Sequence, residues 1–107
     1  MEKIRVEVHT HTKYSKDSML GKYLYLIMLK VRKIDIIAIT DHNTIKGGVE
    51  YKDFLEKYRI RVIVGEEVFT TKGEIIGLFL EKEILAGLSP EETIKEIKEQ
   101  NGIVYIP

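Results

Sequence analysis

The sequence predicts an α/β fold in which a mostly parallel sheet is built from strands that alternate with helices. Three observations support this prediction. Short apolar runs rich in β-branched residues recur along the chain, helical stripes lie between them, and turn residues separate the two. Strands that alternate with helices form a parallel sheet or barrel, because each crossover returns the chain in the same direction. A chain of 107 residues is expected to form one domain around a single core.

The first half of the chain is expected to hold two strands and two helices. Residues 4–9 alternate apolar and polar side chains, as a half-buried strand does, and residues 35–40 form a buried strand. The helix between them has the predicted inner stripe Leu20, Leu24, Ile27, Met28 and Val31. The helix after Gly47-Gly48 has the predicted inner stripe Tyr51, Phe54, Leu55 and Tyr58.

The second half is expected to begin with a buried strand at residues 61–64. Residues 68–70 and 74–80 then pair as a β-hairpin around a turn at Lys72-Gly73. Turn residues flanked by β-branched runs are typical of such a hairpin.

A helix is predicted to begin at Ser89. The run Ser89-Pro90-Glu91-Glu92 combines a capping hydroxyl, proline at the first helical position and glutamate at the third. Ile94 and Ile97 form its inner stripe, and Asn101-Gly102 ends it. Residues 103–106 are then expected to form a fourth core strand.

The composition argues against several classes of function. Seventeen basic and seventeen acidic residues give no net charge, so no bulk field recruits nucleic acid or an anionic membrane. The absence of cysteine excludes disulfides and thiolate metal sites. The longest apolar run, residues 23–29, is far shorter than the ~20 residues of a membrane span. With no basic, apolar leader at the start, we expect a cytoplasmic protein.

Two of the three histidines lie one residue apart on the first predicted strand. Side chains two apart in a strand point the same way, so His9 and His11 face one space together with Glu7. Two imidazoles can then bind one zinc, iron or manganese ion. An isolated pair of this kind is also explained by hydrogen bonds to backbone at a strand end, so further evidence is needed.

The next two strands supply that evidence. The second is followed by Thr40-Asp41-His42-Asn43 and the third by Gly65-Glu66-Glu67, so all three histidines lie at the carboxyl ends of strands. Ligands bind at this edge in barrels and open α/β sheets. Alone, the two glutamates would indicate a solvated strand end. Three successive strands that end in histidine or acid predict a metal site.

Several neighbouring residues have two interpretations. Asp17 could cap the first helix or bind a metal. Asp41 is expected to accept a hydrogen bond from an imidazole rather than to bind the metal itself. Thr44 is expected to cap the second helix, whose amides could receive a phosphate oxygen together with Lys46, although an ordinary exposed lysine is the simpler explanation.

The order of these motifs resembles the PHP (polymerase and histidinol phosphatase) superfamily. The matching segments are H-x-H-T-x-x-S-x-D at 9–17, I-T-D-H-N-T at 39–44, G-x-E-V at 65–68 and IIGLFL at 75–80. The resemblance implies a distorted barrel of seven βα units. It also implies up to three divalent ions, zinc, manganese or iron, at the carboxyl rim, and hydrolysis of phosphate esters by a metal-activated water.

By this resemblance the metal ligands are His9, His11, Asp17, His42 and Glu67, with Glu67 bridging two ions. The family pattern of glycine, one apolar residue and glutamate selects Glu67, but Glu66 stands in the usual apolar position and leaves the choice open. Glu74 lies where some relatives place a metal-binding histidine, and an exposed hairpin residue is the alternative.

In the family, a strand like the last one leads into a His-Pro motif and further ligands, whereas this chain stops at Tyr105-Ile106-Pro107. A barrel of this type has about 250 residues. We therefore expect residues 1–107 to be a single PHP-type domain, truncated before the distal ligands. The open sheet edge beside its last strand is expected to promote self-association or completion by a partner chain.

The favoured functional hypothesis is a metal-dependent phosphoesterase that acts on a small phosphomonoester or nucleotide-like substrate. The alternative is a non-catalytic metal-binding module, or a fragment that a partner chain completes. A nuclease-like role on DNA ends is the least favoured, because the net charge is zero and no basic aromatic stripe is present.

Overall fold

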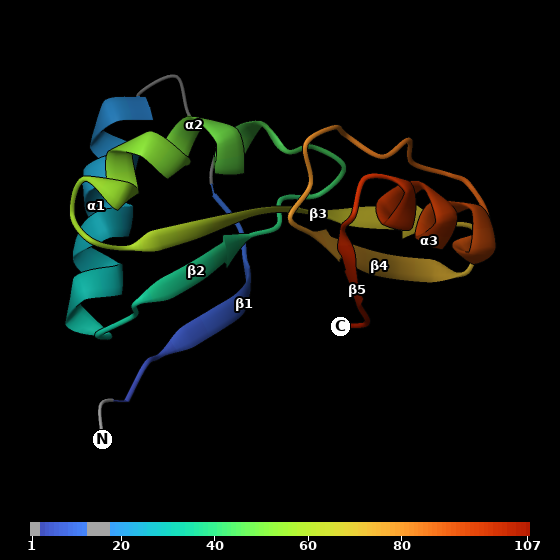
Figure 1. Ribbon diagram of the computed structural model, residues 1–107. Helices are drawn as coiled ribbons and strands as arrows, with labels where there is room; N and C mark the ends of the chain where they lie inside the picture. Colours follow the sequence, from blue (N-terminus) through green and yellow to red (C-terminus); the bar gives the residue numbers. More distant parts are fainter. Residues whose placement is uncertain (1–2, 13–17) are drawn as a thin grey trace.

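The computed structural model of the protein describes residues 3–12 and 18–107, which form five strands and three helices (Figure 1). In chain order these are β1 (Val6–Thr10), α1 (Ser18–Val31), β2 (Ile36–Ile39), α2 (Lys46–Glu56), β3 (Arg61–Thr70), β4 (Gly73–Leu78), α3 (Pro90–Glu99) and β5 (Ile103–Tyr105). In this described part of the chain, no helix has both the length and the apolar character needed to cross a bilayer. The predicted α/β class is confirmed.

The strands form one curled, mixed sheet in the order β1-β2-β3-β4-β5. β1, β2 and β3 pair in parallel, whereas β4 is antiparallel to both β3 and β5. β5 therefore runs in the predicted direction, but the hairpin strand β4 separates it from the parallel strands. The expectation that residues 103–106 form a core strand is confirmed only for Val104, which packs against the core beneath α3, because Ile103 and Ile106 are more than half exposed. Among the described strands β5 lies at the sheet edge, where β4 is its one neighbour.

β3 is a single ten-residue strand that changes partners halfway along. Residues 61–64 pair with β2, and residues 65–70 pair with β4. The predicted third strand and the first arm of the hairpin are thus one element. Gly65 stands at the change of partners, where an added Cβ would lie 2.6 Å from the carbonyl oxygen of Gly77. Only glycine allows the two backbones to approach this closely.

The helices pack against one face of the sheet. α1 and α2 cover β2 and the first half of β3, where Leu29, Leu55 and Ile37 are fully buried (Figure 1). α3 packs over the second half of β3 and over β4 through Ile97. A smaller apolar group lies on the opposite face and includes Ala38.

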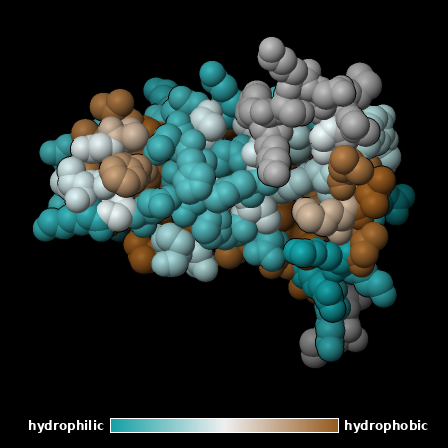
Figure 2. Space-filling view, turned by 180° about the vertical axis from the view of Figure 1, so that it is seen from behind, coloured by the Kyte–Doolittle hydropathy of each residue, from teal (hydrophilic) through white to brown (hydrophobic). Residues whose placement is uncertain are grey.

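The predicted inner stripe of α1 is wrong. Its core-facing residues are Tyr25, Leu26 and Leu29, whereas the predicted residues Leu24, Ile27, Met28 and Val31 are exposed. Residues 23–29 are apolar around the whole helix, so periodicity alone could not select the buried face. Figure 2 shows the resulting apolar surface over α1, at the right-hand side of the view.

The ends of the other two helices follow local chemistry. The Ser89 hydroxyl accepts a hydrogen bond from the backbone N–H of Glu92, with Pro90 in the first turn, so the predicted start of α3 is confirmed. α2 begins at Lys46, which places Gly47-Gly48 in its first turn rather than before it. The prediction that Thr44 caps α2 is wrong, because the N-cap residue is Ile45, which makes no side-chain capping bond; Thr44, one position earlier, accepts a hydrogen bond from the Lys46 N–H.

Candidate metal centre

The candidate site is built where the three parallel strands end. His9 lies on β1 and His11 just beyond it, His42 follows β2, and Glu67 lies on β3 three residues after the segment that pairs with β2. Backbone hydrogen bonds extend beyond the strand ends: Glu67 N–H donates to Asp41 O, and Asn43 N–H donates to Glu67 O. These bonds hold the loop after β2 alongside β3, so His42 is fixed beside Glu67.

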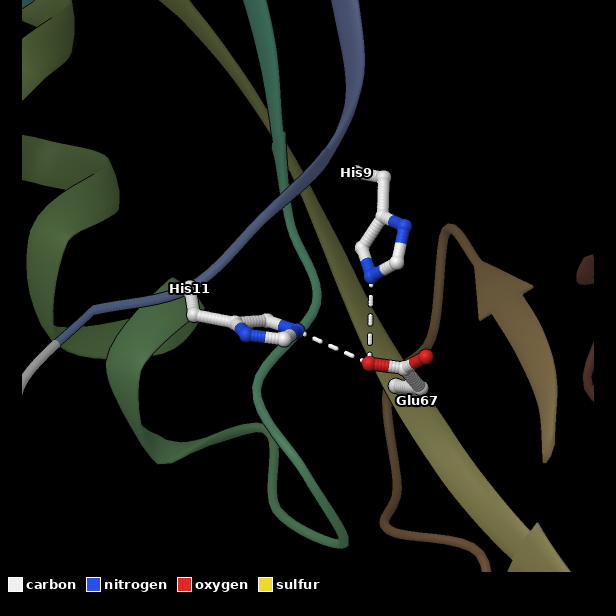
Figure 3. A group of neighbouring side chains, drawn as sticks. All are labelled: His9, His11 and Glu67. Atoms are coloured by element: carbon white, nitrogen blue, oxygen red, sulfur yellow. Dashed lines mark hydrogen bonds and ion pairs between the residues drawn. The ribbon is translucent and has the colours of Figure 1, made fainter. Parts of the chain in front are cut away.

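The imidazoles of His9, His11 and His42 converge on the carboxylate of Glu67. Oε1 of Glu67 lies 3.1 Å from Nε2 of His9 and 2.8 Å from Nε2 of His11, and Figure 3 shows both rings pointing toward it. Nδ1 of His42 lies 3.5 Å from the same oxygen. The ring centroids of His11 and His42 are 4.5 Å apart. The structure therefore brings four of the five predicted site residues together.

Glu67 is buried while the histidines around it are partly exposed. Burial raises the pKa of the Glu67 carboxyl, but its contacts with His9, His11 and Glu74 together lower the pKa below the ordinary value. The carboxylate is thus ionised at neutral pH. An ionised acid held among imidazole nitrogens is a strong donor set for a divalent cation.

A second group of ligand atoms shares Glu67 with the first. His42 Nδ1 lies 3.2 Å from Oε2 of Glu74, and the ligand atoms of His42, Glu67 and Glu74 all lie within 4.8 Å of one another. His9, His11 and Glu67 form the other group with the same spacing. Glu74, at the start of β4, is therefore an exposed hairpin residue and also a neighbour of the site.

The donor set fits a divalent metal ion. Ligand atoms at about 2.0–2.2 Å from a tetrahedral zinc ion are separated from one another by roughly 3.3 Å. The separations of 2.8 and 3.1 Å between the Glu67 oxygen and the nitrogens of His11 and His9 are close to that value. Small side-chain rotations would open the group to the spacing that an ion requires.

The geometry also separates Glu66 from Glu67. Glu66 is fully buried on the face that the helices cover, where its Oε1 accepts a hydrogen bond from the backbone N–H of Ile84. Its Oε2 has no hydrogen-bond partner among the described residues. Burial raises the pKa of Glu66 to about 7. Of the two glutamates, only Glu67 reaches the histidines.

The prediction that Asp41 accepts a hydrogen bond from an imidazole is wrong. Its buried carboxylate accepts hydrogen bonds from the backbone N–H and the hydroxyl of Thr12, not from an imidazole. An added Cβ on Gly47 would collide with both Asp41 and Thr12. Asp41 therefore anchors Thr12, the residue after His11, to the loop between β2 and α2, and so acts on the site through the backbone.

The amino end of α2 is already occupied by a carboxylate. Glu83 accepts hydrogen bonds from the Thr44 hydroxyl and from the N–H of Ile45. These bonds lower the pKa of Glu83, and the nearby charge of Lys46 adds to the effect. The hypothesis that this helix end receives a phosphate oxygen is not supported, because its amide donor and its cation face Glu83.

Asp17, the fifth predicted ligand, lies outside the described residues.

Three residues near the site could not be identified from the sequence. Thr12, Asn43 and Glu83 were not singled out for the contacts they make, such as the bond from Phe69 N–H to the Asn43 side chain. Nothing in a single sequence pairs residues that are 26 to 39 positions apart.

Comparison with known proteins gives a consistent result. The PHP domain family matches residues 7–105. The chain is 46% identical over 114 residues to the uncharacterized protein MJ1587 of Methanocaldococcus jannaschii, covering 97% of this chain and 67% of that protein. It is 36% identical over 104 residues to the uncharacterized protein MJ0417 of the same organism, covering 97% of this chain and 39% of that protein.

Proposed function

Because the chain belongs to the PHP domain family, we propose that it is a metal-dependent phosphoesterase that hydrolyses a small phosphate ester. The observation that supports this proposal most directly is the convergence of three imidazoles on the ionised, buried Glu67. The curled half-barrel is consistent with the amino-terminal part of a TIM-like barrel, which carries ligands at this rim.

His9 and His11 would hold the ion through Nε2, and Glu67 would supply the negative charge. When bound, a divalent ion supplies Lewis acidity and lowers the pKa of a coordinated water. The imidazoles must be neutral to bind it, so activity is expected to fall on acidification. Because His11 and His42 are exposed, the substrate phosphate would approach from their side and not through the core.

The chain's own residues keep this arrangement rigid. Glu67 lies in a strand that is paired on both sides, and His42 is held to it by backbone hydrogen bonds. The Thr12–Asp41 contact fixes Thr12, the residue next to His11. Preorganised ligands lower the cost of assembling a catalytic site.

The proposal is tested with p-nitrophenyl phosphate, assayed with added Mn²⁺ or Zn²⁺ before and after chelation. Glu67→Gln should abolish metal-dependent turnover, because the neutral amide removes the central charge at almost constant size. Glu66→Gln is the matched control, since that side chain lies on the other face. Turnover that survives chelation would contradict the proposal. Bound metal with no turnover would instead support the alternative of a metal-binding module.

A further inference from the structure

We propose that two adjoining cavities beside the first half of β3 form a nucleotide site, in which Arg59 and Arg61 hold the phosphate chain and Phe79 stacks on the base. The phosphate end of this site is separate from the candidate metal centre, because Arg61 precedes Glu67 by six residues, about 20 Å along an extended strand. The inference does not depend on the proposed function.

The two cavities meet at Glu56 and Arg61, which line both of them. The first has a volume of about 450 Å³, and Arg59 and Ile60 complete its wall. The second, of about 410 Å³, lies along residues 61–64, which pair only with β2 among the described strands. Each volume is in the range of pockets that hold small molecules.

The first cavity presents two guanidinium groups that are free to bind an anion. In the described part of the chain, neither Arg59 nor Arg61 forms an ion pair, and both residues are exposed. Glu56 in the same wall is already engaged, because its Oε2 accepts a hydrogen bond from Val62 N–H and lies 3.6 Å from Lys52 Nζ. Guanidinium forks without an acidic partner match the paired oxygens of phosphate groups.

The surroundings of the first cavity add positive charge. The loops after α1 and α2 lie at the same end of the sheet (Figure 1), where Lys30 Nζ donates a hydrogen bond to Tyr58 O. Residues 30–35 and 56–61 together carry six basic and two acidic side chains. Subtracting the two carboxylates and about half a negative unit at each helix end leaves a net charge of about +3. An oligophosphate is therefore attracted to this end, although the whole chain is neutral.

Phe79 gives the second cavity a surface for a flat ring. The residue is 51% exposed and lines the cavity together with Val62 and Val64. Its backbone φ of +61° lies in the left-handed region, which bulky residues rarely adopt and which is found most often at binding sites. A hydrogen bond from Leu80 N–H to Val64 O holds the chain in place beside it. An accessible aromatic ring in a fixed position is a stacking partner for a base.

The two cavities require different chemistry from one ligand. The first is basic, whereas the second is lined mainly by apolar side chains, and Arg61 lies where they join. Inorganic phosphate would occupy only the first, and an uncharged aromatic molecule only the second. A nucleoside triphosphate carries several negative charges at one end and a flat ring at the other, so it can occupy both.

Isothermal titration calorimetry with ATP in a buffer that contains EDTA tests this site without metal-mediated binding elsewhere. The wild type should bind one ATP per chain, more tightly than tripolyphosphate. Arg61→Gln should weaken binding of both ligands by about tenfold, and Arg61→Lys should restore only part of the affinity, because lysine keeps the charge but not the fork. Phe79→Ala should weaken ATP binding to the level of tripolyphosphate and leave tripolyphosphate binding unchanged.

The control is Lys95→Gln, which removes one positive charge from α3 outside both cavities and should bind ATP like the wild type. Circular dichroism of each variant checks that it is folded. No ATP binding in EDTA, or an equal loss in Arg61→Gln and Lys95→Gln, would overturn the site. ATP binding that is unchanged in Phe79→Ala would overturn the nucleotide assignment. Each result is independent of the phosphatase assay, so this inference and the proposed function can fail separately.

Discussion

Glu66 and Glu67 are consecutive residues of β3 whose carboxyl groups lie on opposite faces of the sheet. Glu67 accepts hydrogen bonds from two imidazoles, whereas Glu66 meets the backbone N–H of Ile84 in the interior. Their pKa values are shifted in opposite directions, downward for Glu67 and upward for Glu66. Side chains alternate between the two faces of a strand, so adjacent acids can belong to different chemical environments.

The first prediction concerns metal-linked stability. A ligand that binds only the folded chain stabilises it by about 2.7 kcal/mol at 100 times its dissociation constant. Zn²⁺ should therefore raise the melting temperature of the wild type and of Glu66→Gln by several degrees, but not that of Glu67→Gln. Differential scanning fluorimetry with and without Zn²⁺ measures this. An equal zinc shift in Glu67→Gln would contradict the assigned role of that carboxylate.

The second prediction concerns the pH dependence of folding through Glu66. Burial raises the pKa of this acid from an ordinary 4.5 to about 7, so the fold prefers its protonated form. Its contribution to stability is complete below pH 4.5 and is lost as the pH rises through about 7. The loss is on the order of 3 kcal/mol.

Glu66→Gln removes this dependence because the amide does not ionise. We expect the free energy of unfolding to rise by about 1–2 kcal/mol at pH 8, somewhat less than the full electrostatic cost because the buried amide keeps an unpartnered donor. At pH 4 little change is expected. Urea denaturation at both pH values measures the difference, with Glu96→Gln on the exposed side of α3 as the control. A destabilised variant at pH 8 would refute this account of Glu66.

The third prediction compares two glycines inside helices. Gly→Ala in a helix normally stabilises by up to about 1 kcal/mol. Gly21→Ala in α1 should show this gain, because the new Cβ would lie an ordinary 3.4 Å from the Tyr51 hydroxyl. Gly47→Ala should instead cost about 1–3 kcal/mol, because the methyl group displaces the Thr12–Asp41 contact. Thermal unfolding of both variants measures the difference. A stabilised Gly47→Ala variant would contradict the prediction, because it would mean that the Thr12–Asp41 contact moves aside at little cost.

Much of the fold could be predicted because the signals were local. The cap at Ser89 and the apolar run of β2 each depend on a few adjacent residues, and each has its expected structure. The hairpin is also present, but its turn is Thr71-Lys72, one residue earlier than the predicted Lys72-Gly73. The buried face of α1 could not be predicted, since its apolar residues surround the helix. The buried face of α1 is the face that packs against β2 and α2, and the positions of these elements cannot be deduced from the local sequence of α1.

The candidate site also has features that could be predicted from the sequence and features that could not. Histidines and acids at strand ends could be placed together because parallel strands end at one edge. The choice between Glu66 and Glu67 required the register of β3, and the partner of Asp41 required the path of the chain near Thr12. Strand geometry requires that adjacent side chains point to opposite faces, but tertiary packing decides which of the two faces the core.

The fourth prediction concerns association. We propose that copies of the chain associate through the open edge of β5, which has one paired neighbour and exposed Ile103. Ile103→Lys should then shift the protein toward monomer in light scattering, with unchanged circular dichroism. Ile27→Lys on the exposed face of α1 is the comparison. A monomeric wild type, or loss of association only in Ile27→Lys, would reject β5 as the interface.

The most direct test is an anomalous difference map, recorded at the zinc edge, from a crystal of the zinc-loaded protein. Side chains supplied by separate strands should surround one peak, with His9 Nε2, His11 Nε2 and a Glu67 oxygen each about 2.0–2.2 Å from it. A zinc-loaded crystal with no peak among these three residues, or with its strongest peak elsewhere, would contradict the metal centre on which the proposed activity depends.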